Sequence, residues 1–572
     1  MDYSIKVGGE AGQGIQTIGD TLSRVFSRSG YHVFTTQDYD SRIRGGHNYY
    51  QIRFSENPVL APRDIIDIIV ALDNQSIVLH ENELSRGGLI IYDSSTLKKS
   101  YEKSNFLDIP FVTLAVEHGG SKIMENTVAV GAVLGMLGMD LEILKGIMKE
   151  VFHKKGEAVI QSNINSAMAG YDFALKNCPS CSFSVAPVGK AKMLIGGTEA
   201  LGFGVVASGC KFYSAYPMTP STGIMTYVTD KAKEYGIVVE QAEDEISAIN
   251  MALGASYAGV RAMTGTSGGG FALMVEGISL SGMLEMPVVI ALGQRPGPAT
   301  GLPTRTEQGD LFFALHAGHG EFPKVLLAPG TPEQAFFLTN KAFDLAEKYQ
   351  IPVIILTDTY LADTQWTFDG FDLGALKYKD YRLRGETFSK LPDYKRFAYT
   401  DTGISPLAVP GDAKHVVVVD SDEHDEEGHI DETAETRVRM TDKRLFKKLP
   451  LITQEIAPPV LYGSPDPETV VVCWGSLYGV VKEAVNVLLK DKKIAMLHFS
   501  EIYPLPLSDK FDYMKLLRNA KHAICAELNA TGQFARLVRA ETGFEFNKRI
   551  NRYDGRAFSI EKMIGEINAH IG

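Results

Sequence analysis

The chain has 572 residues and a formal charge of −12, from 57 Lys and Arg against 69 Asp and Glu. This length predicts roughly three to five domains, and a composition of 45% hydrophobic and 22% charged residues excludes a disordered or fibrous chain. An acidic chain without a Lys- or Arg-rich stretch is not expected to bind nucleic acid.

No apolar segment reaches the roughly 18–20 residues that a membrane-spanning helix needs. The longest, residues 128–139, stops at Asp140 and predicts a buried core helix. The first residues, MDYSIKVGGEAGQG, lack the basic and then apolar pattern of a secretory signal. With five cysteines, the chain is expected to be a cytoplasmic protein with reduced thiols and no membrane partner.

Residues 1–175 predict an α/β domain. A glycine-rich turn joins an expected strand at 3–7 to a helix at 15–29. Further strands are predicted at 31–36, 65–71, 88–92 and 111–116. Their alternation with helical patterns favours a largely parallel sheet. Residues 176–192 show no periodicity and predict a linker.

Two more α/β runs follow, over residues 193–365 and 466–572. In the first, small-residue helices at 245–259 and 271–284 alternate with strands predicted at 238–241, 288–292 and 353–357. The second has strands predicted from 469, at 494–499 and at 523–527. Between the runs, residues 366–465 are rich in aromatics and contain the acidic run SDEHDEEGHIDETAE, which predicts a connecting region with a polar loop.

The glycine-rich turn near the amino terminus reads GGEAGQG. Backbone N–H groups of such a turn can contact a phosphate at a helix start. As a dinucleotide fingerprint it is incomplete, because Thr17 stands where a third glycine is expected after Gly12 and Gly14. A plain tight turn and a phosphate or nucleotide contact are equal alternatives.

A second glycine pair lies in the sequence SRIRGGHN. It places Arg42, Arg44 and His47 beside Gly45 and Gly46. Two arginines and a histidine next to a glycine pair predict either a site for a phosphorylated ligand or a solvated turn.

Polar side chains follow three strands of the second run. Thr219 lies on a proline-stiffened turn, Glu245 opens a small-residue helix, and Arg295 follows the strand predicted at 288–292. Because carboxyl ends of parallel strands meet at one edge, we expect these side chains to lie together. The carboxylate suits a ring nitrogen and the arginine a substrate carboxylate, while helix capping and helix-dipole stabilisation are the structural alternatives. Other ligand-binding candidates at this edge are Tyr216, Pro217, Ser267 and Gly268.

Two weaker patterns favour a structural interpretation. Cys178 and Cys181 have metal-ligand spacing, but a single pair does not close a zinc or iron–sulfur site, so we expect an inert linker pair and no metal site. His424 and His429 are expected in a solvated polar loop.

Eight motifs, in order along nearly the whole chain, resemble the 2-oxoacid:ferredoxin oxidoreductases, and in particular an alpha subunit with a fused gamma domain. They are GGEAGQGI, IRGGHN, YPMTPST, QAEDEISAINMALGASYAG, TSGGGFALM, GQRPGPATGLPTRTEQGDL, DEHDEEGHI and ELNATGQFARLVR. The resemblance implies a multidomain α/β fold. Its expected parts are a gamma-type, coenzyme A-side domain at 1–175, a pyrimidine-binding thiamine-diphosphate domain at 193–365 and a transketolase C-terminal-like domain at 466–572.

The resemblance also implies a thiamine-diphosphate enzyme that decarboxylates a 2-oxoacid oxidatively, acylates coenzyme A and passes electrons to ferredoxin. Glu245 matches the glutamate that bonds the aminopyrimidine nitrogen N1′ and promotes ylid formation, and Thr219 and Arg295 match groups near the substrate carboxylate. Arg44, Gly45, Gly46 and His47 are candidates at the coenzyme A entrance, and Gly12 and Gly14 are the other cofactor-binding candidates of that domain.

The sequence has no GDG with a downstream Asn, the signature of a diphosphate–Mg²⁺ site, and no four-cysteine iron–sulfur pattern. The resemblance therefore implies a beta subunit that carries Mg²⁺ and a [4Fe-4S] cluster, with two heterodimers associating into a heterotetramer. DEHDEEGHI and TGLPTRTEQGDL look most like the branch that converts 2-oxoglutarate to succinyl-CoA and CO₂, or catalyses the reverse carboxylation. The alternatives are pyruvate or branched-chain 2-oxoacids, an NAD-dependent dehydrogenase, and a non-catalytic scaffold subunit.

Overall fold

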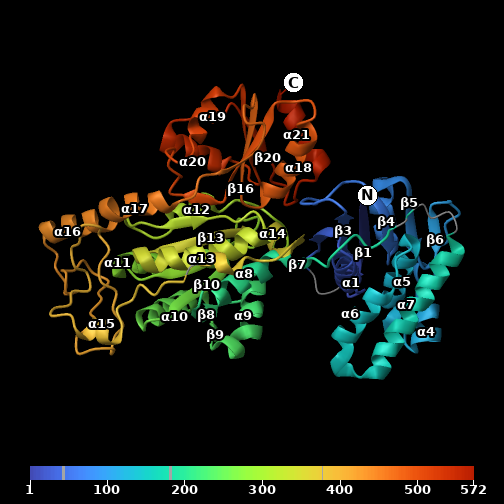
Figure 1. The fold of residues 1–572 in the computed structure, drawn as a ribbon, viewed down its shortest axis with the longest axis horizontal. Coiled ribbons are helices and arrows are strands. Elements are labelled where there is room, and N and C mark those ends of the chain that lie inside the picture. Colours follow the sequence, from blue (N-terminus) through green and yellow to red (C-terminus); the bar gives the residue numbers. More distant parts are fainter. Residues whose placement is uncertain (42–44, 179–182, 184, 377, 572) are drawn as a thin grey trace. The chain divides into compact units, whose positions relative to one another are not determined.

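The computed structural model of the chain describes residues 1–41, 45–178, 183, 185–376 and 378–571. These residues divide into two compact units. The first contains Met1–Ile195, Thr364–Gly370 and Phe558–Lys562, and the second contains Gly196–Asp363, Phe371–Ala557 and Met563–Gly572. Each unit is a layered α/β structure, as the sequence predicts (Figure 1).

The first unit is built on an eight-stranded sheet of order β6-β5-β4-β1-β3-β2-β14-β7. Its strands are β1 (Asp2–Ala11), β2 (His32–Asp38), β3 (Gly45–Ser55), β4 (Ile66–Ala71), β5 (Leu84–Tyr92), β6 (Phe106–Asp108), β7 (Met193–Gly196) and β14 (Gln365–Phe368). The expected parallel pairing holds from β1 through β4 and β5 to β6, whereas β3 pairs antiparallel with both β1 and β2.

One expectation for this unit is wrong, and one strand, β3, was not predicted. Residues 111–116 form part of the helix α4 (Phe111–Gly119), because Pro110 precedes the segment and its carbonyl accepts the N–H of Leu114, the first helical hydrogen bond. The glycine pair at 45–46 is no simple turn but the start of β3, whose register with β1 shifts between Gly9 and Ala11. Positive φ angles of 74° and 76° at Gly45 and Gly46 permit that entry into the strand.

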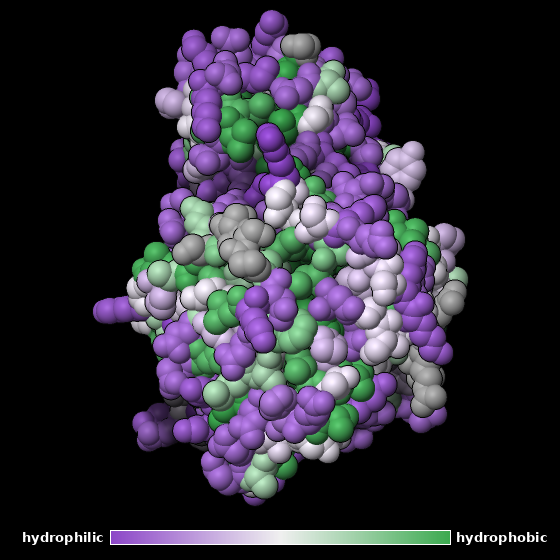
Figure 2. Space-filling model, turned by 90° about the vertical axis from the view of Figure 1, so that its right-hand side faces the viewer, coloured by the Kyte–Doolittle hydropathy of each residue, from purple (hydrophilic) through white to green (hydrophobic). Residues whose placement is uncertain are grey.

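The remaining helices of the first unit are α1 (Ile15–Arg28), α2 (Asn74–His80), α3 (Ser94–Leu97), α5 (Glu125–Leu137), α6 (Glu142–Phe152) and α7 (Glu157–Asn177). Every residue of α5 from 128 to 137 is buried, which confirms the predicted core helix. It packs backbone against backbone on α7, since a Cβ at Gly131 would meet the carbonyl of Ala167. Within the described ranges no helix is long and apolar enough to cross a bilayer. The face of the molecule in Figure 2 is covered by hydrophilic side chains, with apolar patches among them.

The second unit contains two sheets. The seven-stranded sheet has the order β18-β12-β13-β11-β10-β8-β9. Its strands are β8 (Cys210–Ala215), β9 (Val238–Gln241), β10 (Arg261–Ser267), β11 (Val288–Gln294), β12 (Val325–Leu327), β13 (Pro352–Asp358) and β18 (Glu501–Tyr503). All neighbours are parallel except β12 and β18. The helices around it are α8 (Gly197–Ala207), α9 (Thr222–Tyr235), α10 (Glu245–Tyr257), α11 (Gly268–Leu284), α12 (Leu311–His316), α13 (Pro332–Tyr349) and α14 (Thr359–Asp363).

The five-stranded sheet has the order β15-β17-β16-β19-β20, with β15 (Val460–Gly463), β16 (Thr469–Trp474), β17 (Ile494–Phe499), β19 (His522–Glu527) and β20 (Lys548–Asn551). Its helices are α18 (Tyr478–Leu488), α19 (Tyr513–Asn519), α20 (Gln533–Thr542) and α21 (Ile560–Ile571). One hydrophobic core joins both sheets, from Ile290 to Trp474 and Phe534. Gln308 also links them, because its side chain donates to the carbonyl of Trp474 (3.0 Å) and accepts from the N–H of Leu528 (3.1 Å).

The connecting region contains α15 (Gly385–Ser389), α16 (Ala434–Thr441), the π-helix η5 (Asp442–Lys447) and α17 (Lys448–Glu455). The expectation of a solvated loop at His424 is wrong, since its side chain is fully buried and stacks on Phe397 at 3.8 Å. Glu423 explains this, because it pairs with Arg437 and Arg444 and so fixes the acidic run to the helices. His429, in contrast, is exposed as expected.

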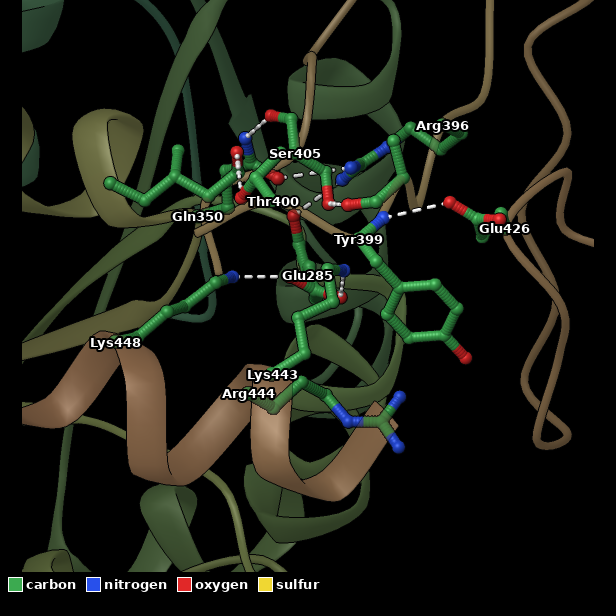
Figure 3. A network of polar contacts seen from close by, with 12 residues as sticks. Glu285, Gln350, Arg396, Tyr399, Thr400, Ser405, Glu426, Lys443, Arg444 and Lys448 are labelled. Atoms are coloured by element: carbon green, nitrogen blue, oxygen red, sulfur yellow. Dashed lines mark hydrogen bonds and ion pairs between the residues drawn. The ribbon is translucent and has the colours of Figure 1, made fainter. Parts of the chain in front are cut away.

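A buried charged cluster, which we name the Glu285 cluster, fastens the connecting region to the end of α11. Both carboxylate oxygens of Glu285 are bonded, one to Lys443 and the other to Lys448, and Arg396 donates to the Glu285 carbonyl (2.6 Å; Figure 3). Each of these side chains is almost completely buried. The two lysines hold the pKa of Glu285 well below its ordinary value.

The cysteines differ in state. Cys210, Cys473 and Cys525 are free and buried, as expected. Cys178 is disulfide-bonded, so the expectation of reduced thiols is wrong there, while Cys181 lies outside the described residues.

We expect the stability of the C-terminal sheet to be sensitive to acid because of His498. This side chain is fully buried, its Nε2 lies 2.9 Å from the carbonyl of Gly475, and burial lowers its pKa to about 4. The unfolded chain takes up a proton near its ordinary pKa of about 6.5 while the fold does not, so stability should fall as the pH decreases from about 6.5 to 4.5, by up to about 3 kcal/mol. Urea unfolding at several pH values checks this, and His498→Gln should lose stability less steeply than the unchanged chain.

Candidate active site

The carboxyl ends of four neighbouring strands bring the predicted side chains to one edge of the seven-stranded sheet. The strands lie in the order β9-β8-β10-β11 and all run parallel. Thr219 follows β8, Glu245 follows β9, and Arg295 follows β11 directly. Ser267 and Gly268 lie where β10 passes into α11. The edge of an open parallel sheet is the place where α/β folds bind ligands.

Glu245 is the buried acid of this edge. Asp244 caps α10 by accepting the N–H of Ser247 (2.8 Å), which makes Glu245 the first helical residue. Its side chain is 3% exposed, and its Oε1 lies 3.5 Å from Thr266 Oγ1, at the limit of a hydrogen bond. A buried carboxylate with so weak a partner is available to bond a protonated ring nitrogen, so the site fits such a heterocycle.

Gly270 keeps space open for this carboxylate. A Cβ at position 270 would collide with Glu245 Oε1 and Thr266 Oγ1, whereas a Cβ at Gly269 would meet nothing within 4 Å. We therefore expect Gly270→Ala to lower the kcat of a reaction that uses Glu245 by roughly 10–100-fold through displacement of the acid. Gly269→Ala, on the same turn of α11, is the matched control. Equal kinetics of the two variants would contradict this position for Glu245.

Arg295 and Thr219 are joined directly. Arg295 Nη1 donates to the carbonyl of Thr219 (2.9 Å), and Pro220 packs on Gly293, where a Cβ would lie 2.8 Å from the proline ring. The guanidinium is half-buried, and burial lowers the pKa of Arg295 against the opposing charge of Asp310. The arrangement orients an arginine with further N–H groups free of Thr219, which suits a carboxylate.

The other candidates at this edge differ in exposure. The Ser267 hydroxyl is buried and has no hydrogen-bond partner among the residues that the structure describes. Tyr216 is 42% exposed and Pro217 is half-buried. Ser267 is thus positioned to bond a ligand, and Tyr216 lies at the rim.

Sequence reasoning missed Asp310, which follows Arg295 in the loop between β11 and α12. Its Oδ2 lies 2.8 Å from the position of a Cβ on Gly268, and burial raises the pKa of Asp310 to about 6. Glu307 lies in the same loop, and its pKa is also raised, first by burial and then by Asp310. The sequence did offer a sign of this site, since the acids Glu307 and Asp310 lie on either side of Gln308. In the structure, Gln308 forms the contact between the two sheets.

The remaining predicted residues belong to the first unit. Gly12 borders a cavity of about 160 Å³ at the carboxyl ends of β1, β4 and β5, together with Lys122, Glu125 and Asn126. Gly14 begins α1 with φ 80°, directly against Asn126. The turn is thus tightly packed and also adjoins a cavity.

His47 lies in β3, after Gly45 and Gly46, and its Nε2 is 2.8 Å from Nε2 of His80. His80 in turn bonds Glu83 through Nδ1 (3.0 Å). Burial lowers the pKa of His47. Arg42 and Arg44 lie outside the described residues.

The described part of the chain has no group of three or more His, Cys, Asp or Glu side chains arranged to hold a metal ion. The edge around Glu245 combines acids, an arginine and a buried hydroxyl. This set suits organic acid chemistry on a bound heterocycle.

Comparison with known proteins gives two family models. Residues 204–443 match the model described as "Pyruvate flavodoxin/ferredoxin oxidoreductase, thiamine diP-bdg", and residues 4–173 match "Pyruvate ferredoxin/flavodoxin oxidoreductase". The first match contains the whole edge from Thr219 to Asp310, and the second contains Gly12 and His47.

Full-length relatives are also found. The 2-oxoacid:ferredoxin oxidoreductase subunit alpha of Saccharolobus solfataricus is 32% identical over 100% of this chain and 98% of its own length. The 2-oxoglutarate oxidoreductase subunit KorA of Mycobacterium tuberculosis is 27% identical over 94% of this chain and 87% of its own. A solved 2-oxoglutarate:ferredoxin oxidoreductase from Magnetococcus marinus, with 2-oxoglutarate, coenzyme A and succinyl-CoA bound, superposes with a TM-score of 0.91 at 31% identity, covering 100% of both chains.

Proposed function

The chain belongs to the alpha subunits of the 2-oxoacid:ferredoxin oxidoreductases, and on that basis we propose that it catalyses the oxidative decarboxylation of 2-oxoglutarate to succinyl-CoA and CO₂, with electrons passed to ferredoxin. The observation that carries this proposal is the convergence of Glu245, Thr219 and Arg295 at one sheet edge in a chain whose whole fold matches an enzyme with 2-oxoglutarate bound. Pyruvate or a branched-chain 2-oxoacid is the alternative substrate.

The pyrimidine-binding domain is proposed at about 193–365; in support, the thiamine-diphosphate family model matches residues 204–443, which contain most of this part and continue into the connecting region. Thiamine diphosphate, when bound, supplies the electron sink for decarboxylation. Glu245 holds a proton at the ring nitrogen, since its carboxylate is buried and weakly bonded. Arg295, held by the carbonyl of Thr219, binds the substrate carboxylate. Ser267, Gly268, Tyr216 and Pro217 are the further residues proposed to contact the cofactor.

A beta subunit is proposed to cover this edge and to supply Mg²⁺ and a [4Fe-4S] cluster. In support, the helices α10 and α11, which begin at this edge, expose large apolar side chains: Ile246 is 50% exposed, Met251 40% and Leu273 48%. Exposed apolar side chains are typical of a surface that a partner covers. A dimer of such heterodimers follows from the symmetry that most oligomers adopt.

The first unit is proposed as the gamma-type domain on the coenzyme A side. Gly12 and Gly14, at the cavity, and Gly45, Gly46 and His47, at the start of β3, are its candidate residues, with Arg44 beside them in the sequence. The linker at 176–192 and the transketolase-like part at 466–572 complete the proposed division.

The test is to co-purify the chain with its beta subunit and to measure coenzyme A-dependent viologen reduction with 2-oxoglutarate, pyruvate and 2-oxoisovalerate. We expect a strong preference for 2-oxoglutarate, and no turnover by the isolated chain. Equal or faster turnover of pyruvate or 2-oxoisovalerate would overturn the assignment of 2-oxoglutarate as the substrate. Absence of activity with all three, in a complex with bound cofactor and an intact cluster, would overturn the enzymatic assignment.

A further inference from the structure

Asp310 is a carboxyl group in the active-site edge that no part of the proposed reaction uses. Its backbone N–H donates to Gln294 Oε1 (3.1 Å), which anchors the residue to the end of β11. Its side chain does not cap α12, although the residue precedes that helix. Its Oδ2 is buried and bonds to none of the residues in the described ranges. The main chain is therefore fixed while one carboxyl oxygen is left without a donor.

Gly268 makes this position possible. A Cβ on Gly268 would lie 2.8 Å from Asp310 Oδ2, so the carboxyl group contacts the first turn of α11 closely. The same turn contains Gly270, which borders Glu245. Asp310 thus lies against one end of this turn and Glu245 against the other.

The charged groups that act on Asp310 come from its own loop. Arg295 stabilises its ionised form, and Glu307 is the second acid beside it. From the C-terminal sheet, Gln533 contacts the loop through a neutral amide, donating to the carbonyl of Gly309 (2.6 Å). Arg536 of the same helix lies over the Phe312 ring at 5.0 Å. Gln294 and Gly268, from β11 and α11, add no charge.

This set is unfavourable for an anionic substrate as long as every acid is ionised. Glu245, Glu307 and Asp310 then oppose Arg295, and 2-oxoglutarate adds two negative charges. An ionised Asp310 also offsets part of the positive charge that Arg295 presents to the substrate carboxylate. A neutral Asp310 removes both obstacles.

We propose that Asp310 takes up a proton when a 2-oxodicarboxylate binds at Arg295, and so couples substrate binding to pH. The inference rests on the proposed function for the identity of the substrate. Asp310 acts by its charge and not by contact with the reacting atoms, because its neutral form removes a negative charge from the edge where Arg295 binds the substrate.

The acid is suited to this role. Burial raises the pKa of Asp310 to about 6, against the influence of Arg295, which lowers it. Above this value the free site is mostly ionised, and an arriving carboxylate raises the pKa further by like-charge repulsion. At full coupling, KM therefore rises by up to about tenfold for each pH unit above 6.

The experiment compares the complete complex carrying Asp310→Asn with the unchanged complex between about pH 6 and pH 8. In the unchanged complex, KM for 2-oxoglutarate should rise roughly tenfold or more over this range. Asp310→Asn, neutral at every pH, should show a flat KM that is below the unchanged value at pH 8. Glu307→Gln is the matched control and should keep the slope. Should Asp310→Asn assemble poorly, Asp310→Ser tests the same flat profile, and Asp310→Glu should restore the slope.

A readout without turnover completes the test. Calorimetric binding of glutarate, an unreactive dicarboxylate, at about pH 7.5 in buffers of different ionisation enthalpy should show net proton uptake by the unchanged complex and none by Asp310→Asn. A slope in KM or a proton uptake that survives in Asp310→Asn would overturn the proposal. If the complex turns over no 2-oxoacid but still takes up a proton at Asp310 when glutarate binds, the proposed function fails and this inference stands.

Discussion

Glu245→Gln in the complete complex is expected to lower kcat for the 2-oxoacid by about 10²- to 10⁴-fold, the range for a lost general acid–base group. Glutamine occupies nearly the same volume beside Gly270 and Thr266, so the pocket that the carboxylate fills should be preserved. What is lost is the negative charge that holds a proton at the cofactor ring. Steady-state viologen reduction measures kcat, and a separate titration measures the affinity for thiamine diphosphate, which should change far less.

Glu243→Gln provides the matched control. Glu243 lies two residues earlier, outside α10, and its side chain is exposed. The control should keep the unchanged kcat. If Glu245→Gln were as active as Glu243→Gln, the chain would be a scaffold for chemistry done elsewhere, and the assignment of the acid would be wrong.

The candidate site was predictable because it depends on topology rather than on side-chain detail. Parallel strands place their carboxyl ends at one edge, so residues that follow different strands meet although they are far apart in sequence. The contact between Arg295 and the carbonyl of Thr219 is the direct result. The roles of these residues as cofactor and substrate ligands stay predictions, to be tested by the variants above.

The errors in the first unit have a local cause. Residues 111–116, FVTLAV, are β-branched and apolar, which favours a strand, yet Pro110 starts a helix there and Gly120, with φ 76°, ends it. Burial of one face of α4 decides between the two. The strand β3 was missed because its glycine pair is typical of a turn, and only the pairing with β1 and β2 makes it a strand.

The surroundings of Asp310 and of the acidic run could not be predicted from the order of residues in the sequence. The closeness of Asp310 to Gly268 depends on how a loop folds back over the start of α11. Similarly, a run of acids predicts a solvated surface, but Glu423 pairs with Arg437 of α16 and Arg444 of η5, and the neighbouring His424 is buried against Phe397. Both outcomes depend on contacts between residues that are far apart in the sequence: the approach of the loop to Gly268 for Asp310, and ion pairs for Glu423.

The π-helical form of η5 is explained by the contacts of two lysines with Glu285. Lys443 and Lys448 are five residues apart, and in an α-helix of about 3.6 residues per turn they would point in different directions. A π-helix bonds residue i to i+5, so the two positions lie near one another on the same side. That geometry lets both ammonium groups reach the one carboxylate of Glu285 (Figure 3).

Glu285→Gln is accordingly expected to lower the free energy of unfolding of the second unit by about 3–5 kcal/mol, because two buried lysines lose their counter-charge. Lys443, whose pKa burial lowers to about 7, and Lys448 would have to lose their protons to remain buried. Between the lowered pKa and the ordinary value of about 10.5, the unfolded chain binds more protons than the fold, so the variant should regain stability as the pH rises from about 7 to 9.

Urea unfolding at these two pH values measures the loss and its recovery. The matched control removes the cations together with the anion, as Glu285→Gln, Lys443→Met and Lys448→Met in one chain, and should recover much of the lost stability, since no unpaired charge is then buried. If the triple variant were less stable than Glu285→Gln alone, the lysines would stabilise the fold by packing rather than by charge. The Glu285 cluster would then not be an electrostatic link between the connecting region and α11, whose first turn borders Glu245, the proposed catalytic acid.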